Sequence, residues 1–289
     1  MNTFWKIGAA IAAMSLSTAP AAAETLFGLT SGNRIVSFDS ATPGTLLGNA
    51  AISGLASGEV LVGLDLRPVN RTLYTLSTAG NLYSLTGAAT GYNANLIGNI
   101  GTTVSGTRFG LDFNPTVDRL RFVSDFDQNL RINPNNAVTI VDGTIDAPGA
   151  EALVGAAYAN NIAAATTTTL YGIDAGGNQL LRSTNANAGT YVEVGTISGL
   201  DFGGLNNLGF DISGRTGAAY FAIGSQLYTI DLTSAAATSL GGIGGGSLIG
   251  LTAAGVPEPA SWAMMIGGFG LVGGTLRRRA TAAGREQLA

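Results

Sequence analysis

The segment TLYTLSTAGNLYSL (72–85) has the pattern of a β-hairpin, because two short apolar runs, each with a Leu-Tyr pair, flank a turn containing Gly80 and Asn81. Four other segments repeat this pattern, at 25–39, 120–133, 169–183 and 219–232. Their turn positions, 33, 81, 129, 178 and 226, are separated by 48, 48, 49 and 48 residues. A period this regular predicts a repeat architecture.

A second marker lies inside an apolar run once in each repeat: Gly63-Leu64-Asp65, Gly110-Leu111-Asp112, Gly155-Ala156-Ala157, Gly209-Phe210-Asp211 and Gly250-Leu251-Thr252. A third apolar run follows most hairpins, so each unit holds four strands in meander order. Four short antiparallel strands in every 40 to 50 residues or so are typical of a propeller blade. We therefore predict an all-β fold, a five-bladed β-propeller of four-stranded antiparallel blades, with an open β-solenoid as the alternative.

The phase of the repeat predicts how the ring closes. The first copy starts at its second strand, TLFGL (25–29), and an extra run, SLIGLTA (247–253), is left over at the other end. This run carries the first-strand marker, so we expect it to pair beside residues 25–31. Such pairing removes a sheet edge that would otherwise invite aggregation.

The N-terminal residues 1–23 have the layout of a secretory signal peptide. A single positive charge at Lys6 precedes an apolar run from Ile7 to Leu16, and small residues at Ala21 and Ala23 form the cleavage site. A buried N-terminal helix is the alternative. The signal peptide predicts an exported domain over residues 24–256.

The C-terminal residues 257–289 combine a Pro-Glu-Pro turn, an uncharged glycine-rich run from Ala260 to Leu276 that predicts a short hydrophobic helix, and an arginine cluster. The pattern resembles the PEP-CTERM sorting tail of Gram-negative bacteria, through Pro257, Glu258, Pro259, Trp262, Arg277, Arg278 and Arg279. The resemblance implies recognition by an exosortase-type membrane protease, transient anchoring in the inner membrane, and delivery to the cell surface or exopolysaccharide matrix. A plain membrane anchor is the alternative.

The repeats themselves also resemble a known family. The stretches FGLDFNPTVDRLRFVSDFDQNLRINPN (109–135) and VGLDLRPVNRTLYTLSTAGNLYSL (62–85) are similar to a secreted bacterial family catalogued as domain of unknown function number 4394. The similarity spans residues 24–254. It implies export and a repeat fold, and it implies no established activity.

Charge and composition exclude several functions. Without Lys6 and the four tail arginines, nine basic residues remain, and without Glu258 and Glu286, 16 acidic residues remain, so residues 24–256 carry a net charge of −7. Nucleic-acid binding, which needs cationic contacts to phosphate, is therefore disfavoured. Histidine and cysteine are absent from all 289 residues, which removes His-based triads and His- or Cys-ligated zinc.

Two sets of acidic residues are candidate cation sites. The marker aspartates Asp65, Asp112 and Asp211 lie on the innermost strands, so they are expected to project into the central channel, where carboxylates suit Ca²⁺. Alternatively, each one accepts hydrogen bonds within its own blade. Asp125, Asp127 and Asn129 follow the spacing of a calcium loop, but Leu130 replaces the glycine of an EF-hand, so only a looser site or a solvated hairpin tip remains.

Charge concentrates between residues 108 and 151, which hold 11 of the 25 charges of the exported domain. Arg119, Arg121 and Arg131 lie there on paired strands and are candidate contacts to the uronate groups of an acidic polysaccharide, through bidentate hydrogen bonds. Local Arg-Asp ion pairs within the third blade are the alternative.

These observations lead to two hypotheses of different classes. The first is a non-enzymatic binding module, displayed at the surface or in the matrix, that binds a polysaccharide or a surface protein. The second is a Ca²⁺-dependent propeller hydrolase in which the channel carboxylates hold an ion and its bound water.

Overall fold

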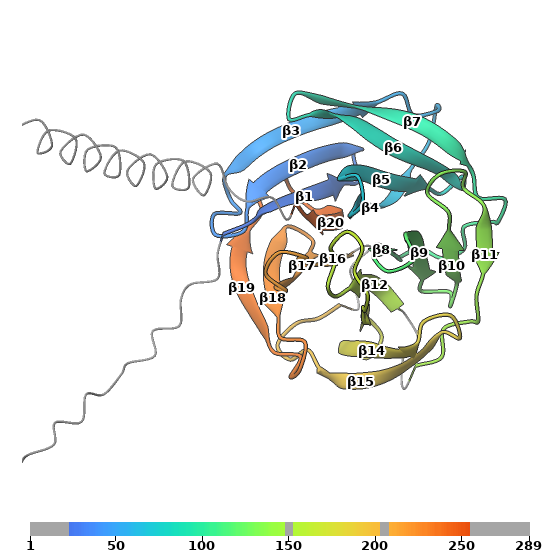
Figure 1. Ribbon diagram of the computed structural model, residues 1–289. Coiled ribbons are helices and arrows are strands. Elements are labelled where there is room, and N and C mark those ends of the chain that lie inside the picture. The colour runs from blue at the N-terminus through green and yellow to red at the C-terminus, as the bar shows by residue number, and fades with distance from the viewer. Residues whose placement is uncertain (1–22, 148–152, 203–207, 255–289) are drawn as a thin grey trace, which may run out of the picture.

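The computed structural model describes residues 23–147, 153–202 and 208–254, and all regular structure in these ranges is β-strand. Figure 1 shows the strands as curved sheets around a common centre. The predicted sorting tail with its short hydrophobic helix lies outside the described residues, as does the predicted signal peptide up to residue 22. Among the described residues, no helix is long and apolar enough to cross a membrane.

The largest sheet has eight strands in the order β20-β1-β2-β3-β7-β6-β5-β4. Its strands are β1 (Thr25–Thr30), β2 (Arg34–Asp39), β3 (Leu46–Ser53), β4 (Leu61–Arg67), β5 (Thr72–Ser77), β6 (Asn81–Ala88), β7 (Gly91–Asn99) and β20 (Leu248–Ala253).

Three further sheets have four antiparallel strands each. The first holds β8 (Phe109–Asn114), β9 (Arg119–Ser124), β10 (Asn129–Ile132) and β11 (Thr139–Val141). The second holds β12 (Leu153–Tyr158), β13 (Leu170–Asp174), β14 (Gln179–Asn185) and β15 (Thr190–Thr196). The third holds β16 (Leu208–Ile212), β17 (Ala219–Ile223), β18 (Gln226–Ile230) and β19 (Ala237–Gly242).

The five predicted hairpins are present, as β1–β2, β5–β6, β9–β10, β13–β14 and β17–β18. Their turns depend on residues that tolerate a left-handed backbone. Asn33 has a φ of 53° and donates its N–H to the carbonyl of Thr30 at 3.1 Å. Asparagine accepts this conformation more readily than most residues, and Asn178 adopts it at the equivalent turn with a φ of 52°.

The expectation of five separate four-stranded sheets needs a correction at one place. Strands β3 and β7 pair in parallel over two positions, Ile52 with Tyr92 and Ser53 with Asn93, which joins two four-stranded groups into the eight-stranded sheet. Both strands are long and lie on the outside of their groups, where unpaired backbone groups accept a further strand.

The predicted closing strand is confirmed. β20 pairs antiparallel with β1, from Leu26 opposite Ala253 to Thr30 opposite Leu248. The strands β4, β8, β12, β16 and β20 contact one another in a closed cycle, and they lie toward the middle of Figure 1. The two ends of the described chain are therefore joined within one sheet.

The marker glycines permit this innermost ring. A Cβ atom at Gly110 would lie 2.6 Å from the backbone nitrogen of Ala156, and one at Gly250 would lie 2.7 Å from that of Leu64. Only glycine allows neighbouring strands to approach this closely. Two positions after each glycine, the innermost strands carry the equivalent residues of the repeat, Asp65, Asp112, Ala157, Asp211 and Thr252.

The core lies between the sheets. Every residue of β4 is buried, and one apolar cluster joins Val62 and Leu76 to Phe113 and Phe122 of the next sheet. The rings of Tyr74 and Phe113 meet edge to face at 5.1 Å. Full burial of a phenylalanine side chain contributes roughly 1.5–3 kcal/mol, so these contacts hold neighbouring sheets in place.

Candidate functional site

A cluster of carboxylates lies at the centre of the ring. The five equivalent positions of the innermost strands carry Asp65, Asp112, Ala157, Asp211 and Thr252. One oxygen of each of the three aspartates lies within 4.8 Å of the other two. The exposed fractions of these aspartates are 0–1%. The structure thus brings together the three residues that the repeat marker singled out; cation binding by them stays a prediction.

Thr252 connects this aspartate cluster to the closing strand. Its hydroxyl lies 2.8 Å from Oδ1 of Asp65 and 3.1 Å from Oδ2 of Asp211, and it accepts the N–H of Leu66 at 3.2 Å. The N–H of Ala253 also donates to Oδ2 of Asp211, at 2.6 Å. A hydroxyl has a single hydrogen, so it serves one of the two carboxylates at a time.

Backbone N–H groups supply most of the remaining donors. The N–H of Phe113 donates to Oδ2 of Asp65 at 2.7 Å, and that of Tyr158 donates to Oδ1 of Asp112 at 3.2 Å. The N–H of Ile212 donates to Oδ1 of the preceding residue, Asp211, at 2.6 Å. Oδ2 of Asp112 is buried and has no hydrogen-bond partner among the residues that the structure describes. The cluster is therefore one partner short.

Burial sets the electrostatics of the aspartate cluster. It raises the pKa of Asp65 well above its usual value, and the charge of Asp211 raises it further. Burial likewise raises the pKa of Asp112, with the charges of Asp65 and Asp211 adding to the effect. The pKa of Asp211 is raised by burial too, although hydrogen bonds from the backbone of Ala253 and Ile212 oppose the shift. Three adjacent carboxylates cannot all stay ionised here without added positive charge.

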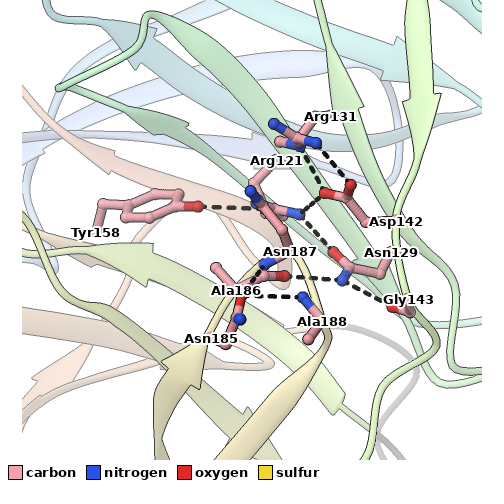
Figure 2. A network of polar contacts seen from close by, with 10 residues as sticks. All are labelled: Arg121, Asn129, Arg131, Asp142, Gly143, Tyr158, Asn185, Ala186, Asn187 and Ala188. Carbon is pink, nitrogen blue, oxygen red and sulfur yellow. Dashed lines mark hydrogen bonds and ion pairs between the residues drawn. The ribbon is translucent and has the colours of Figure 1, made fainter.

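A second polar cluster joins two sheets around Arg121, and its residues are shown in Figure 2. Arg121 is 1% exposed. It donates to Asp142 at 2.6 Å, to Asn129 at 2.7 Å and to Asn187 at 2.9 Å. Its Nε donates to the hydroxyl of Tyr158 at 3.2 Å. Strand β9 is thereby tied to β12 and to the β14–β15 turn.

The three arginines predicted as polysaccharide contacts therefore differ in access. Arg121 is enclosed, and Arg131, opposite it in the β9–β10 pairing, holds Asp142 through both of its oxygens at 2.6 and 2.8 Å. Arg119 is partly exposed and donates to the backbone carbonyls of Val117 and Asp118. Arg121 and Arg131 therefore form local ion pairs with Asp142, which is the alternative that the sequence left open.

The second candidate cation site is distributed among other partners. Asp125 accepts hydrogen bonds from the backbone and hydroxyl of Thr107 at 2.8 and 2.6 Å and forms an ion pair with Arg108. Asn129 is 2% exposed, and its side-chain oxygen accepts a hydrogen bond from Arg121. Asp127 is exposed at the hairpin tip. The structure therefore does not gather the polar atoms of Asp125, Asp127 and Asn129 around one point.

Two hollows lie where the innermost strands end. One, of about 330 Å³, is lined by Leu66, Pro68, Arg71, Asn161, Ile162, Ala163, Gly214, Arg215, Ala253 and Ala254. The other, of about 310 Å³, is lined by Asn114, Tyr158, Thr168, Thr169, Leu170 and residues 182–187, including Arg182. We call this side of the ring the strand-end face. Loop 159–169 contributes to both hollows and so separates them.

The arginines of these hollows have no carboxylate partner in the described part of the chain. The side chains of Arg71 and Arg182 form no ion pair or hydrogen bond there, and the side chain of Arg215 donates only to the carbonyl of Ala23, leaving its Nε unpaired. Burial lowers the pKa of Arg71. Sequence reasoning missed all three. Arg71 and Arg215 follow an innermost strand by a few residues, and that position was the available signal.

The sorting-signal residues, from Pro257 to Arg279, and the cleavage residue Ala21 lie outside the described residues. Ala23 is described, and its carbonyl accepts a hydrogen bond from Arg215 at 2.9 Å. Next to it, Glu24 is 1% exposed and accepts a hydrogen bond from Ser213 at 2.5 Å.

Comparisons with solved structures give weak similarities. A protein of unknown function from Bacteroides thetaiotaomicron has 14% identity and a TM-score of 0.49, and the match covers 75% of this chain and 57% of that one. A chain of a nidogen/laminin complex has 12% identity and a TM-score of 0.48, with 80% and 98% covered. Myxococcus xanthus glutaminyl cyclase has 12% identity and a TM-score of 0.44, with 68% and 89% covered. At these TM-scores the similarities support no conclusion about the fold family or the function of the protein.

The family comparison is more informative. No curated protein matches the chain. Residues 255–279 match the PEP-CTERM protein-sorting motif, which implies export and processing by an exosortase, a membrane protease. Residues 34–252 match the profile of a family described as a domain of unknown function, and this match covers most of the chain. The protein therefore belongs to the DUF4394 family.

Proposed function

We propose that the protein is a non-enzymatic β-propeller binding module, exported to the outer surface or extracellular matrix of a Gram-negative bacterium, and that it binds an acidic polysaccharide. In this interpretation the eight-stranded sheet counts as two blades, so the domain over residues 24–256 has five. The closed cycle of innermost strands and the β1–β20 pairing support that count.

The unpaired arginines of the strand-end face carry the proposal. Arg71, Arg182 and Arg215 line two hollows of about 330 and 310 Å³ in a domain with an acidic net charge. Guanidinium groups bind carboxylates bidentately, and asparagine and threonine side chains beside them suit sugar hydroxyls. Uronate residues present both kinds of group. Arg119, which begins β9 near Asn114, remains a candidate additional contact.

The sorting tail supports the location. A signal peptide over residues 1–23 with cleavage after Ala23 would deliver the domain across the inner membrane, and the PEP-CTERM motif would hold it there until an exosortase acts. Transient membrane association through residues 257–289 then precedes release to the surface or matrix. An exopolysaccharide is the acidic polymer that such a location offers.

The burial of the central aspartates favours binding over hydrolysis. A hydrolytic metal centre needs an open coordination position that substrate can reach. Asp65 and Asp112 are 0% exposed and Asp211 is 1% exposed, so substrate cannot contact them in this arrangement. The arginine hollows, in contrast, are open to solvent-borne polymers.

The test measures binding of the purified protein to polygalacturonate and to neutral dextran. The variant Arg71→Gln/Arg182→Gln should weaken polygalacturonate binding about tenfold or more, because a hydrogen bond to a charged group contributes about 1.5–3 kcal/mol. Dextran binding should stay weak throughout. The melting temperature should not change, since neither side chain bonds to another described residue.

A matched control removes the same charge elsewhere. Arg34→Gln/Arg108→Gln removes two arginines that lie away from both hollows, one at the start of β2 and one directly before β8. Because Arg34 bonds to Asn49 and Arg108 to Asp125, the melting temperature of this variant is measured as well. If this control variant weakens polygalacturonate binding as much as Arg71→Gln/Arg182→Gln, the net charge of the protein determines this binding and the proposed site is wrong. Undiminished binding by Arg71→Gln/Arg182→Gln would have the same consequence.

A further inference from the structure

Among the described residues, no positive side chain lies against the aspartate cluster at the ring centre. All four ion pairs of the described residues involve other acids: Asp118, Asp125 and, twice, Asp142. The groups that do contact Asp65, Asp112 and Asp211 are backbone N–H groups, the Thr252 hydroxyl and, between Asp112 and Asp211, the neighbouring carboxyl group. None of these groups is cationic. Burying several carboxylates with neutral donors alone is costly.

Two observations indicate that a ligand completes the cluster. First, Oδ2 of Asp112 is buried without a hydrogen-bond partner in the described chain. Second, the fifth equivalent position carries Ala157, whose side chain has no donor to offer. Buried polar atoms in native structures nearly always have partners, and an unpaired one calls for an explanation.

The spacing indicates which ligand fits. The three carboxylate oxygens lie within 4.8 Å of one another. Oxygens this close together can all contact one ion. Ca²⁺ takes carboxylate, hydroxyl and carbonyl oxygens at about 2.3–2.6 Å in flexible geometry. Mg²⁺ demands near-octahedral geometry and gives up its waters reluctantly, so a buried set of protein oxygens suits Ca²⁺ better.

We propose that Asp65, Asp112 and Asp211, with the hydroxyl oxygen of Thr252, form a structural Ca²⁺ site that holds the closing strand β20 in the ring. The three aspartates come from β4, β8 and β16, and Thr252 comes from β20 itself. An ion bound to all four would link the last strand of the fold to β8 and β16, in two other sheets, and to β4, at the opposite edge of its own eight-stranded sheet. This site is independent of polysaccharide binding.

The site is expected to act on stability. A cation that binds the folded ring and not the unfolded chain stabilises the fold in proportion to the logarithm of its concentration. At about one hundred times the dissociation constant, the melting temperature should rise by about 5 °C or more for a domain of this size. Mg²⁺ at the same concentration should raise it less.

The experiment follows the melting temperature of the chelator-treated protein during titration with CaCl₂, MgCl₂ or NaCl at matched ionic strength. Asp112→Asn should abolish the Ca²⁺-dependent rise. In metal-free buffer this variant should melt no lower than the wild type, because asparagine replaces a buried carboxyl group whose ionised form its acidic neighbours disfavour. The matched control Asp127→Asn changes an exposed acid whose φ of 57° asparagine tolerates, and it should keep the full rise.

Elemental analysis supplies a readout that needs no variant. The wild-type protein, equilibrated with Ca²⁺ and freed of unbound salt, should retain one Ca²⁺ ion per chain. If it retains none and its melting temperature does not change with Ca²⁺, the proposal is wrong. Protons shared among the three carboxyl groups would then neutralise the cluster. A Ca²⁺ response that survives in Asp112→Asn but disappears in Asp127→Asn would place the ion at the hairpin tip and contradict it equally.

Discussion

The two buried clusters of charged residues differ in how completely their charges and hydrogen-bonding atoms are paired within the chain. The Arg121 guanidinium group donates to the carboxylate of Asp142 and to the amides of Asn129 and Asn187, so opposite charges are present together. In the ring centre, three acids lie together, the described residues offer them neutral donors only, and Oδ2 of Asp112 has no donor among these residues. Both clusters join strands from different sheets.

The difference separates a structural network from a candidate binding site. A buried polar network is stable only when its donors and acceptors are matched, and the Arg121 cluster meets this condition with side chains of the chain itself. The aspartate cluster does not meet it. We therefore expect the first cluster to respond to mutation alone and the second to respond to a ligand as well.

The largest effect is expected where the self-sufficient cluster is broken. Arg121→Ala should lower the free energy of unfolding by about 3–5 kcal/mol, because it leaves the side-chain oxygens of Asn129 and Asn187 without their donor and opens a cavity at a buried position. Asp142 keeps its ion pair with Arg131. Urea unfolding of the purified variant measures this loss. Arg119→Ala is the control and should stay within about 0.5 kcal/mol of the wild type, since Arg119 bonds only to nearby carbonyls. A loss below about 1 kcal/mol for Arg121→Ala would show that this network contributes little.

A smaller effect is expected at the ring centre in chelator-treated protein. Thr252→Val keeps the shape of the side chain but removes the hydroxyl between Asp65 and Asp211, which should lower the free energy of unfolding by about 1–3 kcal/mol. Thr238→Val, on the exposed strand β19, should change it little. Equal stability of Thr252→Val and the wild type in urea would mean that the hydroxyl does not secure the closing strand.

The smallest change in stability is expected at Glu59, a carboxylate that accepts several hydrogen bonds. Glu59 accepts hydrogen bonds from Ser77 at 2.9 Å, from Asn81 at 2.5 Å and from the Tyr83 hydroxyl. Partial burial raises its pKa, but the bonds from Tyr83, Asn81 and Ser77 outweigh this and lower it overall. Its stabilising contribution is therefore present above the pKa of the unfolded chain and is lost as pH falls through the lower folded pKa.

Glu59→Gln tests this pH dependence. The difference in unfolding free energy between wild type and variant should be constant near neutral pH and shrink in the acidic range below the usual glutamate pKa. Urea unfolding at a series of pH values measures it. A difference that does not vary with pH would show that the ionised form of Glu59 has no advantage in the folded protein.

Much of the fold was predictable because the repeat carries it. The regular spacing located the five hairpins, and the unmatched run 247–253 predicted the pairing of β20 with β1. The same repeat predicted that Asp65, Asp112 and Asp211 approach one another, since equivalent positions of neighbouring units face a common centre. The parallel contact between β3 and β7 was not predictable, because it depends on how two outer strands curve in space.

The polar sites were less predictable. Arg121 was expected to reach a ligand, yet it is enclosed by Tyr158 and Asn187, which come from the next repeat. Arg71 and Arg215 carry no motif, and they share a hollow only because β4 and β16 end on the same face. Such contacts form between units, whereas sequence periodicity describes what recurs within each unit.

The central claim is that the ring centre is completed by a cation. A crystal structure of the protein grown with Ca²⁺ tests it most directly. We predict one strong anomalous peak coordinated by Asp65, Asp112, Asp211 and Thr252, at about 2.3–2.6 Å from the carboxylate oxygens. A map without such a peak, in which the carboxyl groups share hydrogen bonds with one another, would contradict the claim.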